Sequence, residues 1–162
     1  MKKIFFALIL SSVALFSNTL NLTQNDIVIL KKLKSLTNDK MMKYSLMAIA
    51  IKESSLGKYV INSKSEDYGL FQANIKTVLK RQKVKDNSYN RSIYAQKLIN
   101  DVGFATANAI IELKYWRKVH KDNWFKTWSS YNTGWNYNSK TGIKYAEKVF
   151  DIIKKLKLEY KL

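Results

Sequence analysis

The sequence contains no cysteine and no proline, and it has only five glycines and one histidine in 162 residues. Without cysteine the chain can form neither a disulfide nor a cysteine nucleophile, and a single histidine also excludes most zinc sites. The lack of proline and the small number of glycines favour continuous helices over a turn-rich β-sandwich. No glycine-rich loop of the kind that binds phosphates is present. Because no disulfide can form, the fold must be stabilised by packing alone.

Negative charge is also scarce, since 29 lysines and arginines stand against 12 aspartates and glutamates, for a formal net charge of +17. Lysines are spread along the whole chain, which is typical of solvated helix faces. A charge of this size also fits an anionic polymer as a partner. Hydrophobic residues make up 46% and charged residues 25% of the chain, a composition that predicts one ordinary globular domain.

The N-terminus has the pattern of a secretory signal. Met1-Lys2-Lys3 is a short basic region, and the apolar run at residues 4–16 is short for a membrane span. We expect a signal peptide at residues 1–17, with its boundary between 14 and 20, and one domain at residues 18–162. An uncleaved anchor is the alternative. Export would place the protein in the periplasm or at the cell wall, and it argues against a nucleic-acid partner.

Hydrophobic periodicity predicts a mainly α fold with one small β-hairpin. Asn25 is expected to cap a first helix whose apolar positions are Ile27, Leu30, Leu33 and Leu36. The segment 41–52 is apolar on nearly all sides, which predicts a central helix ended by Gly57. Turn residues at 62–65 predict the hairpin directly after it. Further helices are expected near 74, at 92–99, at 102–120 and at 124–131. A last helix is expected to bury Ala146, Val149, Phe150, Ile153 and Leu156.

Among the carboxylates, Glu53 stands out because it follows the most apolar run of the chain. Burial there would raise its pKa and suit a general acid. The alternative is a surface glutamate in a last helical turn, where the helix dipole does not favour a negative charge. Glu66 and Asp67 lie in a polar loop, where turn residues are expected. Glu112 and Glu147 are expected on solvated faces.

Four tryptophans and ten tyrosines are present, and many of them lie in the C-terminal half. Trp124 and Trp128 are expected to fill the core. Residues 131–137, which include Trp135, form a glycine-broken loop where a role in holding sugar rings is expected. His120 lies among lysines at a helix end and is expected at the surface.

Four motifs follow one another along the chain: Glu53-Ser54-Ser55, Gly69-Leu70-Phe71-Gln72, Tyr131-Asn132-Thr133-Gly134 and Tyr145-Ala146-Glu147-Lys148-Val149. With these motifs the chain resembles the lysozyme-like lytic transglycosylases, bacterial enzymes that cleave the glycan strands of peptidoglycan. The resemblance covers roughly residues 46–149 and implies an α+β lysozyme-like fold. The short chain and its Asp-Tyr-Gly-Leu-Phe-Gln variant are similar to specialised members that accompany secretion, conjugation or pilus machinery.

The resemblance implies a mechanism in which Glu53 is the only acid and base. Glu53 would protonate the oxygen of the β-1,4 bond between N-acetylmuramic acid and N-acetylglucosamine. It would then accept the proton of the muramic C6 hydroxyl, which closes on C1 to give a 1,6-anhydro end. No metal or cofactor is implied, and the expected partner is the glycan strand, bound by a monomer. The residues expected beside the acid or the sugars are Ser55, Gln72, Tyr131, Asn132 and Tyr145.

The sequence departs from the family pattern at one position and adds a carboxylate at another. The family often carries a glutamate four residues before the tyrosine of its last motif, and Thr141 stands there in this chain. Asp67 precedes Tyr68-Gly69 much as the second catalytic carboxylate of chicken-type lysozymes does. A second carboxylate about 5–5.5 Å from the acid would suit a retaining hydrolase. A lysozyme-type hydrolase is therefore one alternative. A non-catalytic wall-binding scaffold of an envelope-spanning machine is the other.

Overall fold

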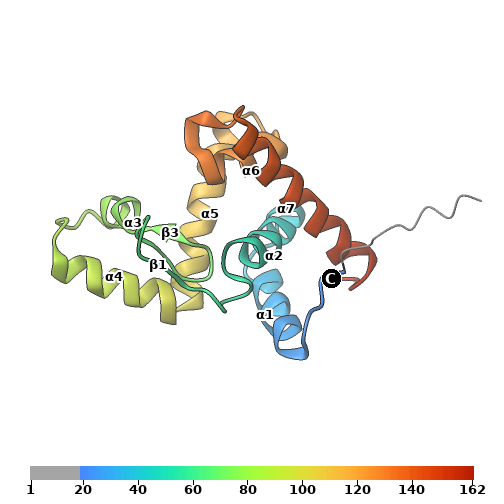
Figure 1. Cartoon of the computed structure of the whole chain (residues 1–162), viewed down its shortest axis with the longest axis horizontal. Helices are drawn as coiled ribbons and strands as arrows, with labels where there is room; N and C mark the ends of the chain where they lie inside the picture. Colours follow the sequence, from blue (N-terminus) through green and yellow to red (C-terminus); the bar gives the residue numbers. More distant parts are fainter. Residues whose placement is uncertain (1–18) are drawn as a thin grey trace, which may run out of the picture.

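A computed structural model describes residues 19–162 of the chain (Figure 1). The signal peptide expected at residues 1–17 lies outside the described residues. Among the described residues, no helix is long and apolar enough to span a membrane.

The described residues form seven α-helices, one short 3₁₀ helix and a small antiparallel sheet. The helices are α1 (Gln24–Ser35), α2 (Lys40–Ser54), α3 (Ile75–Gln82), α4 (Ser88–Asn100), α5 (Val102–Val119), α6 (Trp124–Thr133) and α7 (Lys140–Leu158), with η1 (Gly134–Asn136) after α6. The strands are β1 (Ile61–Asn62), β2 (Asp67–Tyr68) and β3 (Ala73–Asn74), in the order β1-β2-β3. The predicted mainly α lysozyme-like fold is confirmed, and the sheet has a third strand beyond the predicted hairpin.

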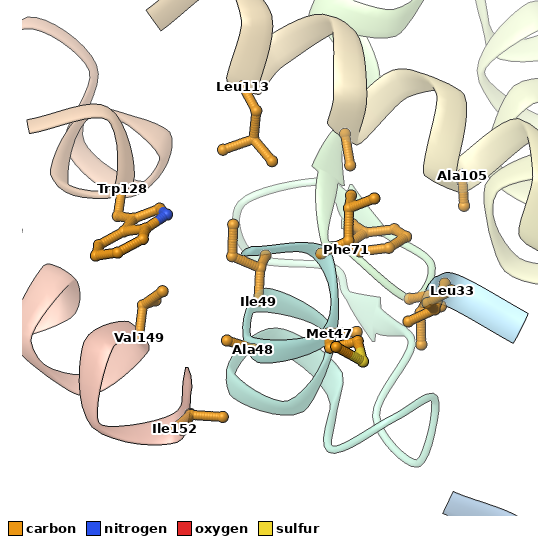
Figure 2. Close-up of a cluster of buried hydrophobic side chains, with 14 of the residues drawn as sticks. Leu33, Met47, Ala48, Ile49, Phe71, Ala105, Leu113, Trp128, Val149 and Ile152 are labelled. Carbon is orange, nitrogen blue, oxygen red and sulfur yellow. The ribbon is translucent and has the colours of Figure 1, made fainter. Parts of the chain in front are cut away.

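Helix α2 occupies the centre of the core, as its nearly uniform apolar sequence predicts. It packs against α1, α5 and α7, and its residues from Leu46 to Ala50 are fully buried. Figure 2 shows Met47, Ala48 and Ile49 of α2 with Trp128 and Val149 on one side and Phe71 on the other. Each large apolar side chain buried in this way contributes about 1.5–3 kcal/mol to folding. The position of Glu53 in the last turn of α2 is therefore set by the best-packed helix of the protein.

Helix α2 ends two residues later than expected, and it ends through three residues with left-handed backbone. Ser55, Leu56 and Gly57 have φ angles of 50°, 59° and 90°. The buried hydroxyl of Ser54 accepts a hydrogen bond from the Gly57 N–H at 2.9 Å and donates one to the Leu70 carbonyl at 2.8 Å. The end of the helix is thus tied directly to the Gly69–Gln72 segment.

The structure corrects two of the expected helix details. The N-cap of α1 is Thr23 rather than Asn25, because Thr23 and Asp26 form a reciprocal capping box. In α7, Phe150 is 47% exposed and Ile152 is buried instead. Phe150 lies about 100° around the helix from Val149, so its ring covers only the edge of the core, where it stacks on Trp128 at 6.5 Å.

Helices α6 and α7 approach each other closely at Gly142. A Cβ atom at this position would lie 2.4 Å from the Ser129 Oγ, 2.7 Å from the Thr133 Oγ1 and 2.9 Å from the Tyr137 carbonyl oxygen. These distances are shorter than any van der Waals contact, so the first turn of α7 fits against α6 only without a side chain. The contact matters for the site because α6 carries Tyr131 and Asn132 and α7 carries Tyr145.

We expect Gly142→Ala to lower the free energy of unfolding by about 2 kcal/mol, because the methyl group forces α6 and α7 apart. Urea denaturation followed by circular dichroism measures this. Gly103→Ala in the first turn of α5 is the matched control, since its Cβ would contact only the Asp101 carboxylate oxygen at 3.2 Å. Equal stability of the two variants would contradict the packing role of Gly142.

Candidate active site

A cavity of about 250 Å³ opens between the sheet, α3, α5 and the end of α6. Its lining is Glu53, Asp67, Gln72, Ala73, Asn74, Thr77, Arg81, Asn108, Ala109, Glu112, Trp116, Ser130, Tyr131, Asn132 and Gly134. Figure 1 shows the sheet, α3 and α4 on one side of α5 and the helices α1, α2 and α7 on the other. The cavity thus gathers residues from the first three motifs of the sequence in one place.

Glu53 reaches this cavity from the last turn of α2 and is partly buried. Burial raises the pKa of its carboxyl group above the ordinary value of 4.5, and the nearby charge of Asp67 raises the pKa further. A hydrogen bond from the Tyr145 hydroxyl and the charge of Lys52 act in the opposite direction, with a smaller effect than burial. A glutamate with a raised pKa, held in place by a neutral donor, can hold a proton and deliver it to a substrate.

Two tyrosines lie beside Glu53 and differ in what they bind. The Tyr145 hydroxyl, from α7, donates to the Glu53 Oε1. The Tyr131 hydroxyl, from the last turn of α6, donates to the Phe71 carbonyl oxygen at 3.0 Å. Burial and the charge of Glu53 raise the pKa of both hydroxyls well above the ordinary value, so both stay protonated donors. Tyr145 positions the acid directly, whereas Tyr131 fastens the backbone of the Gly69–Gln72 segment.

The Gly69–Gln72 segment turns sharply beneath the cavity, and glycine is required at its first position. Gly69 has a φ of 82°, and a Cβ there would lie 2.1 Å from the Leu98 carbonyl oxygen. Gln72 also adopts the left-handed region, with a φ of 48°. Its side-chain amide donates to the Gly69 carbonyl oxygen at 3.0 Å. This turn holds the Gln72 side chain against the cavity wall.

Asp67 lines the same cavity from strand β2 and is fixed by its neighbours. Its carboxylate accepts a hydrogen bond from the Asn74 amide at 3.0 Å and one from the Ser65 hydroxyl at 2.6 Å. Asn74 lies opposite Asp67 in the antiparallel pairing of β2 and β3. Asp67 is therefore both a sheet residue and a second carboxylate that faces the space in front of Glu53.

Not every expected residue reaches the cavity. Asn132 lines it, at the C-terminal end of α6. Ser55 is exposed and does not line it, and the buried hydroxyl of the preceding Ser54 is used to end α2. Tyr131 and Asn132 also belong to the last turn of α6 rather than to a loop, because that helix continues to Thr133.

One wall of the cavity consists of residues that the motifs do not include. Arg81 of α3 forms an ion pair with Glu112 of α5. Glu112 also accepts a hydrogen bond from the Trp116 indole at 2.6 Å, and Asn108 lies 3.4 Å from the same guanidinium group. The expectation of a solvated Glu112 was therefore wrong. The spacing of Asn108, Glu112 and Trp116, four residues apart on one helix, is a signal that could have indicated this face.

An aromatic cluster continues from this wall towards the surface. Trp116 meets the ring of Trp135 edge to face at 5.1 Å, and Trp135 is 67% exposed. His120 stacks on Trp116, meets Tyr137 at 4.5 Å, and hydrogen-bonds the Ser130 hydroxyl at 2.7 Å. Burial lowers the pKa of His120. His120 is therefore partly buried rather than fully at the surface, because the chain after Gly134 folds back against it.

Trp128 is buried, as expected, and Trp124 is only partly buried. The indole N–H of Trp128 donates to the Ser45 hydroxyl of α2 at 2.8 Å. In residues 19–162, no group of three or more histidine or acidic side chains is placed to hold a metal ion.

Comparison with known proteins identifies the family of the chain. The chain matches the family model described as "Transglycosylase SLT domain" over residues 32–153, which is most of its length. The chain therefore belongs to the transglycosylase SLT domain family, a family of enzymes that act on peptidoglycan. The family expected from the four sequence motifs is confirmed, and the specialised secretion-associated subtype stays a prediction.

The chain is also similar to an uncharacterized 20.7 kDa protein in the vs-regB intergenic region of enterobacteria phage T4. The two are 36% identical over 109 residues, which cover 65% of this chain and 58% of the phage protein. The chain thus spans less than two thirds of the length of this relative. No solved structure matches the chain significantly.

The raised pKa of Glu53 makes a prediction about stability. Because the folded protein binds the Glu53 proton more tightly than the unfolded chain does, ionisation of Glu53 destabilises the fold as the pH rises above 4.5. We expect Glu53→Gln, which removes this charge, to unfold at a higher urea concentration than the wild type at about pH 8, with a smaller difference at about pH 4.

Glu147→Gln, on the exposed face of α7, controls for the loss of a carboxylate elsewhere. The measurement is the urea midpoint of unfolding of the wild type and of both variants across this pH range. A difference that grows towards acid, or that Glu147→Gln reproduces, would show that burial does not set the pKa of Glu53.

Proposed function

We propose that the protein is a lytic transglycosylase that cleaves the β-1,4 bond between N-acetylmuramic acid and N-acetylglucosamine and leaves 1,6-anhydro-N-acetylmuramic ends. The proposal rests chiefly on one observation, a partly buried glutamate with a raised pKa, held by a tyrosine hydroxyl at the edge of a polar cavity. Membership of the transglycosylase SLT domain family supports it.

In the first step, Glu53 donates its proton to the glycosidic oxygen while the bond between that oxygen and the muramic C1 breaks. Positive charge develops at C1 and the ring oxygen. The hydrogen bond from Tyr145 occupies the Oε1 of Glu53, which leaves the other carboxyl oxygen to carry the proton to the leaving group. The raised pKa favours the protonated form that this step needs.

In the second step, the muramic C6 oxygen bonds to C1, and its proton passes to the Glu53 carboxylate. The acid is thereby regenerated, and no water molecule is consumed. The same carboxyl group thus serves as acid and then as base. In this proposal Gln72 and Asn132 hydrogen-bond the sugars or their acetamido groups, since both line the cavity. The exposed ring of Trp135, which contacts Trp116 of the cavity wall, offers a further flat face.

The partner in this proposal is the peptidoglycan glycan strand, and a monomer without a cofactor suffices for the reaction. Peptide stems make the strand anionic, which suits a chain with a net charge of +17. The substrate lies outside the cytoplasm, so the proposal includes export to the periplasm or cell wall through the signal expected at residues 1–17. Service to a secretion, conjugation or pilus machine is a narrower form of the same proposal.

We expect Glu53→Gln to reduce the release of muropeptides from purified sacculi by at least about 100-fold, because the amide cannot donate and regain the proton. Mass spectrometry of the products gives the measurement and should find 1,6-anhydro ends with the wild type. Glu147→Gln should digest at the wild-type rate. Digestion by Glu53→Gln at that same rate would exclude Glu53 as the acid, and binding of sacculi without any release by the wild type would favour a scaffold role.

A lysozyme-type hydrolase is the second candidate, because Asp67 faces the same cavity and raises the pKa of Glu53. We expect Asp67→Asn to retain 1,6-anhydro products, since the transglycosylase reaction needs no second carboxylate. Its rate should fall by less than about tenfold, because asparagine can keep the sheet contacts of Asp67 but lacks the charge that raises the Glu53 pKa. Reducing ends as the main product of the wild type, together with loss of activity in Asp67→Asn, would establish the hydrolase instead.

A further inference from the structure

A second pocket, of about 370 Å³, adjoins the cavity of Glu53 and contains no carboxylate. Its lining is Lys52, Asn132, Thr141, Lys144 and Tyr145; we call it the Lys52–Lys144 pocket. It lies beside the site, since Asn132 lines both spaces and Tyr145 binds Glu53 through its hydroxyl. A group held in this pocket would therefore lie close to a sugar bound at Glu53.

Both charged side chains that line the pocket are positive. Among residues 19–162, neither Lys52 nor Lys144 forms an ion pair with an aspartate or glutamate. The ammonium group of Lys52 lies 5.5 Å from the centre of the Tyr145 ring, and both residues line the pocket. Lys144 precedes Tyr145 at the start of α7 and is exposed.

The other side chains of the pocket are hydrogen-bond donors that suit a carboxylate. Asn132 offers an amide and Thr141 a hydroxyl, and both are exposed. Thr141 stands one turn before Tyr145, at the position where an acidic side chain would place a negative charge in this pocket. With threonine there, two ammonium groups and two neutral polar groups remain, an arrangement that attracts a carboxylate.

We propose that the Lys52–Lys144 pocket binds a carboxylate of the peptide stem carried by the muramic acid at the cleavage site. This inference rests on the proposed function and adds a preference for strands with charged stems. The sugars themselves are neutral, so they offer no charge to the two lysines of this pocket. The lactyl carboxyl group of an intact strand is consumed in the amide bond to the stem, so the negative charge of such a strand lies on the stem itself.

The test compares two substrates and several variants. Soluble glycan strands with intact stems are assayed beside the same strands after their stem carboxylates have been converted to amides. We expect amidation to raise the KM of the wild type by about fivefold with little change in kcat, because exposed ion pairs of this kind contribute modestly to binding. The double variant Lys52→Gln/Lys144→Gln should have the same KM for both substrates, equal to the higher KM of the wild type for amidated strands.

Lys144→Gln alone separates binding from catalysis. Lys52 lowers the pKa of Glu53 through its charge, whereas Lys144 is not among the groups that shift that pKa. Lys144→Gln should therefore raise the KM for intact strands and leave the pH profile of kcat unchanged. Lys148→Gln is the matched control, because Lys148 is exposed one turn further along α7 and lines neither pocket.

The inference is overturned if the double variant still prefers intact strands by the wild-type factor, or if Lys148→Gln loses that preference equally. Failure of the proposed function gives a different result, because the wild type would then release no 1,6-anhydro products from either substrate. If the wild type cleaves both substrates with equal KM, the transglycosylase activity is supported, but the binding of a stem carboxylate in the Lys52–Lys144 pocket is excluded.

Discussion

The hydrogen bond between the Tyr145 hydroxyl and the Glu53 carboxyl joins α7 to the last turn of α2, and the geometry of the site depends on it. Its two partners are held by packing rather than by covalent links. Glu53 follows the completely buried centre of α2, and Tyr145 lies on the buried face of α7 beside Ala146 and Val149. A displacement of either helix would separate the acid from the donor that orients it.

The same packing explains why the acid has a raised pKa. Removal of water around Glu53 is the largest effect, and the neutral Tyr145 hydroxyl only partly offsets it. Because burial also raises the pKa of Tyr145 and Tyr131, these hydroxyls stay neutral beside a carboxylate. The site thus combines a protonatable acid with donors that keep their protons, which is what the proposed proton transfer by Glu53 requires.

The positive charge of the chain has several roles in the structure. Arg81 is paired with Glu112 in the wall of the cavity, and Arg117 pairs with Asp39 at the start of α2. Lys52 and Lys144 differ from these arginines because they have no acidic partner within residues 19–162 and adjoin the site. A net charge of +17 therefore does not describe a uniform surface, and in the proposal above the two lysines near Glu53 bind a carboxylate of the peptide stem.

The sequence by itself determined the class of fold, the central helix, the hairpin after it and the group of motif residues, because periodicity and local turn chemistry depend on near neighbours. It also indicated Glu53, since a helix that is apolar on nearly all sides is expected to be buried, and Glu53 lies at the end of such a helix. Only the tertiary structure decided the exposure of Ser55, the pairing of Arg81 with Glu112 and the partial burial of His120. Each of these depends on segments distant in the sequence, whose contact no local pattern records. The position of Tyr145 against Glu53 is of the same kind, because the two residues are 92 apart in the chain and meet only when α2 and α7 pack together.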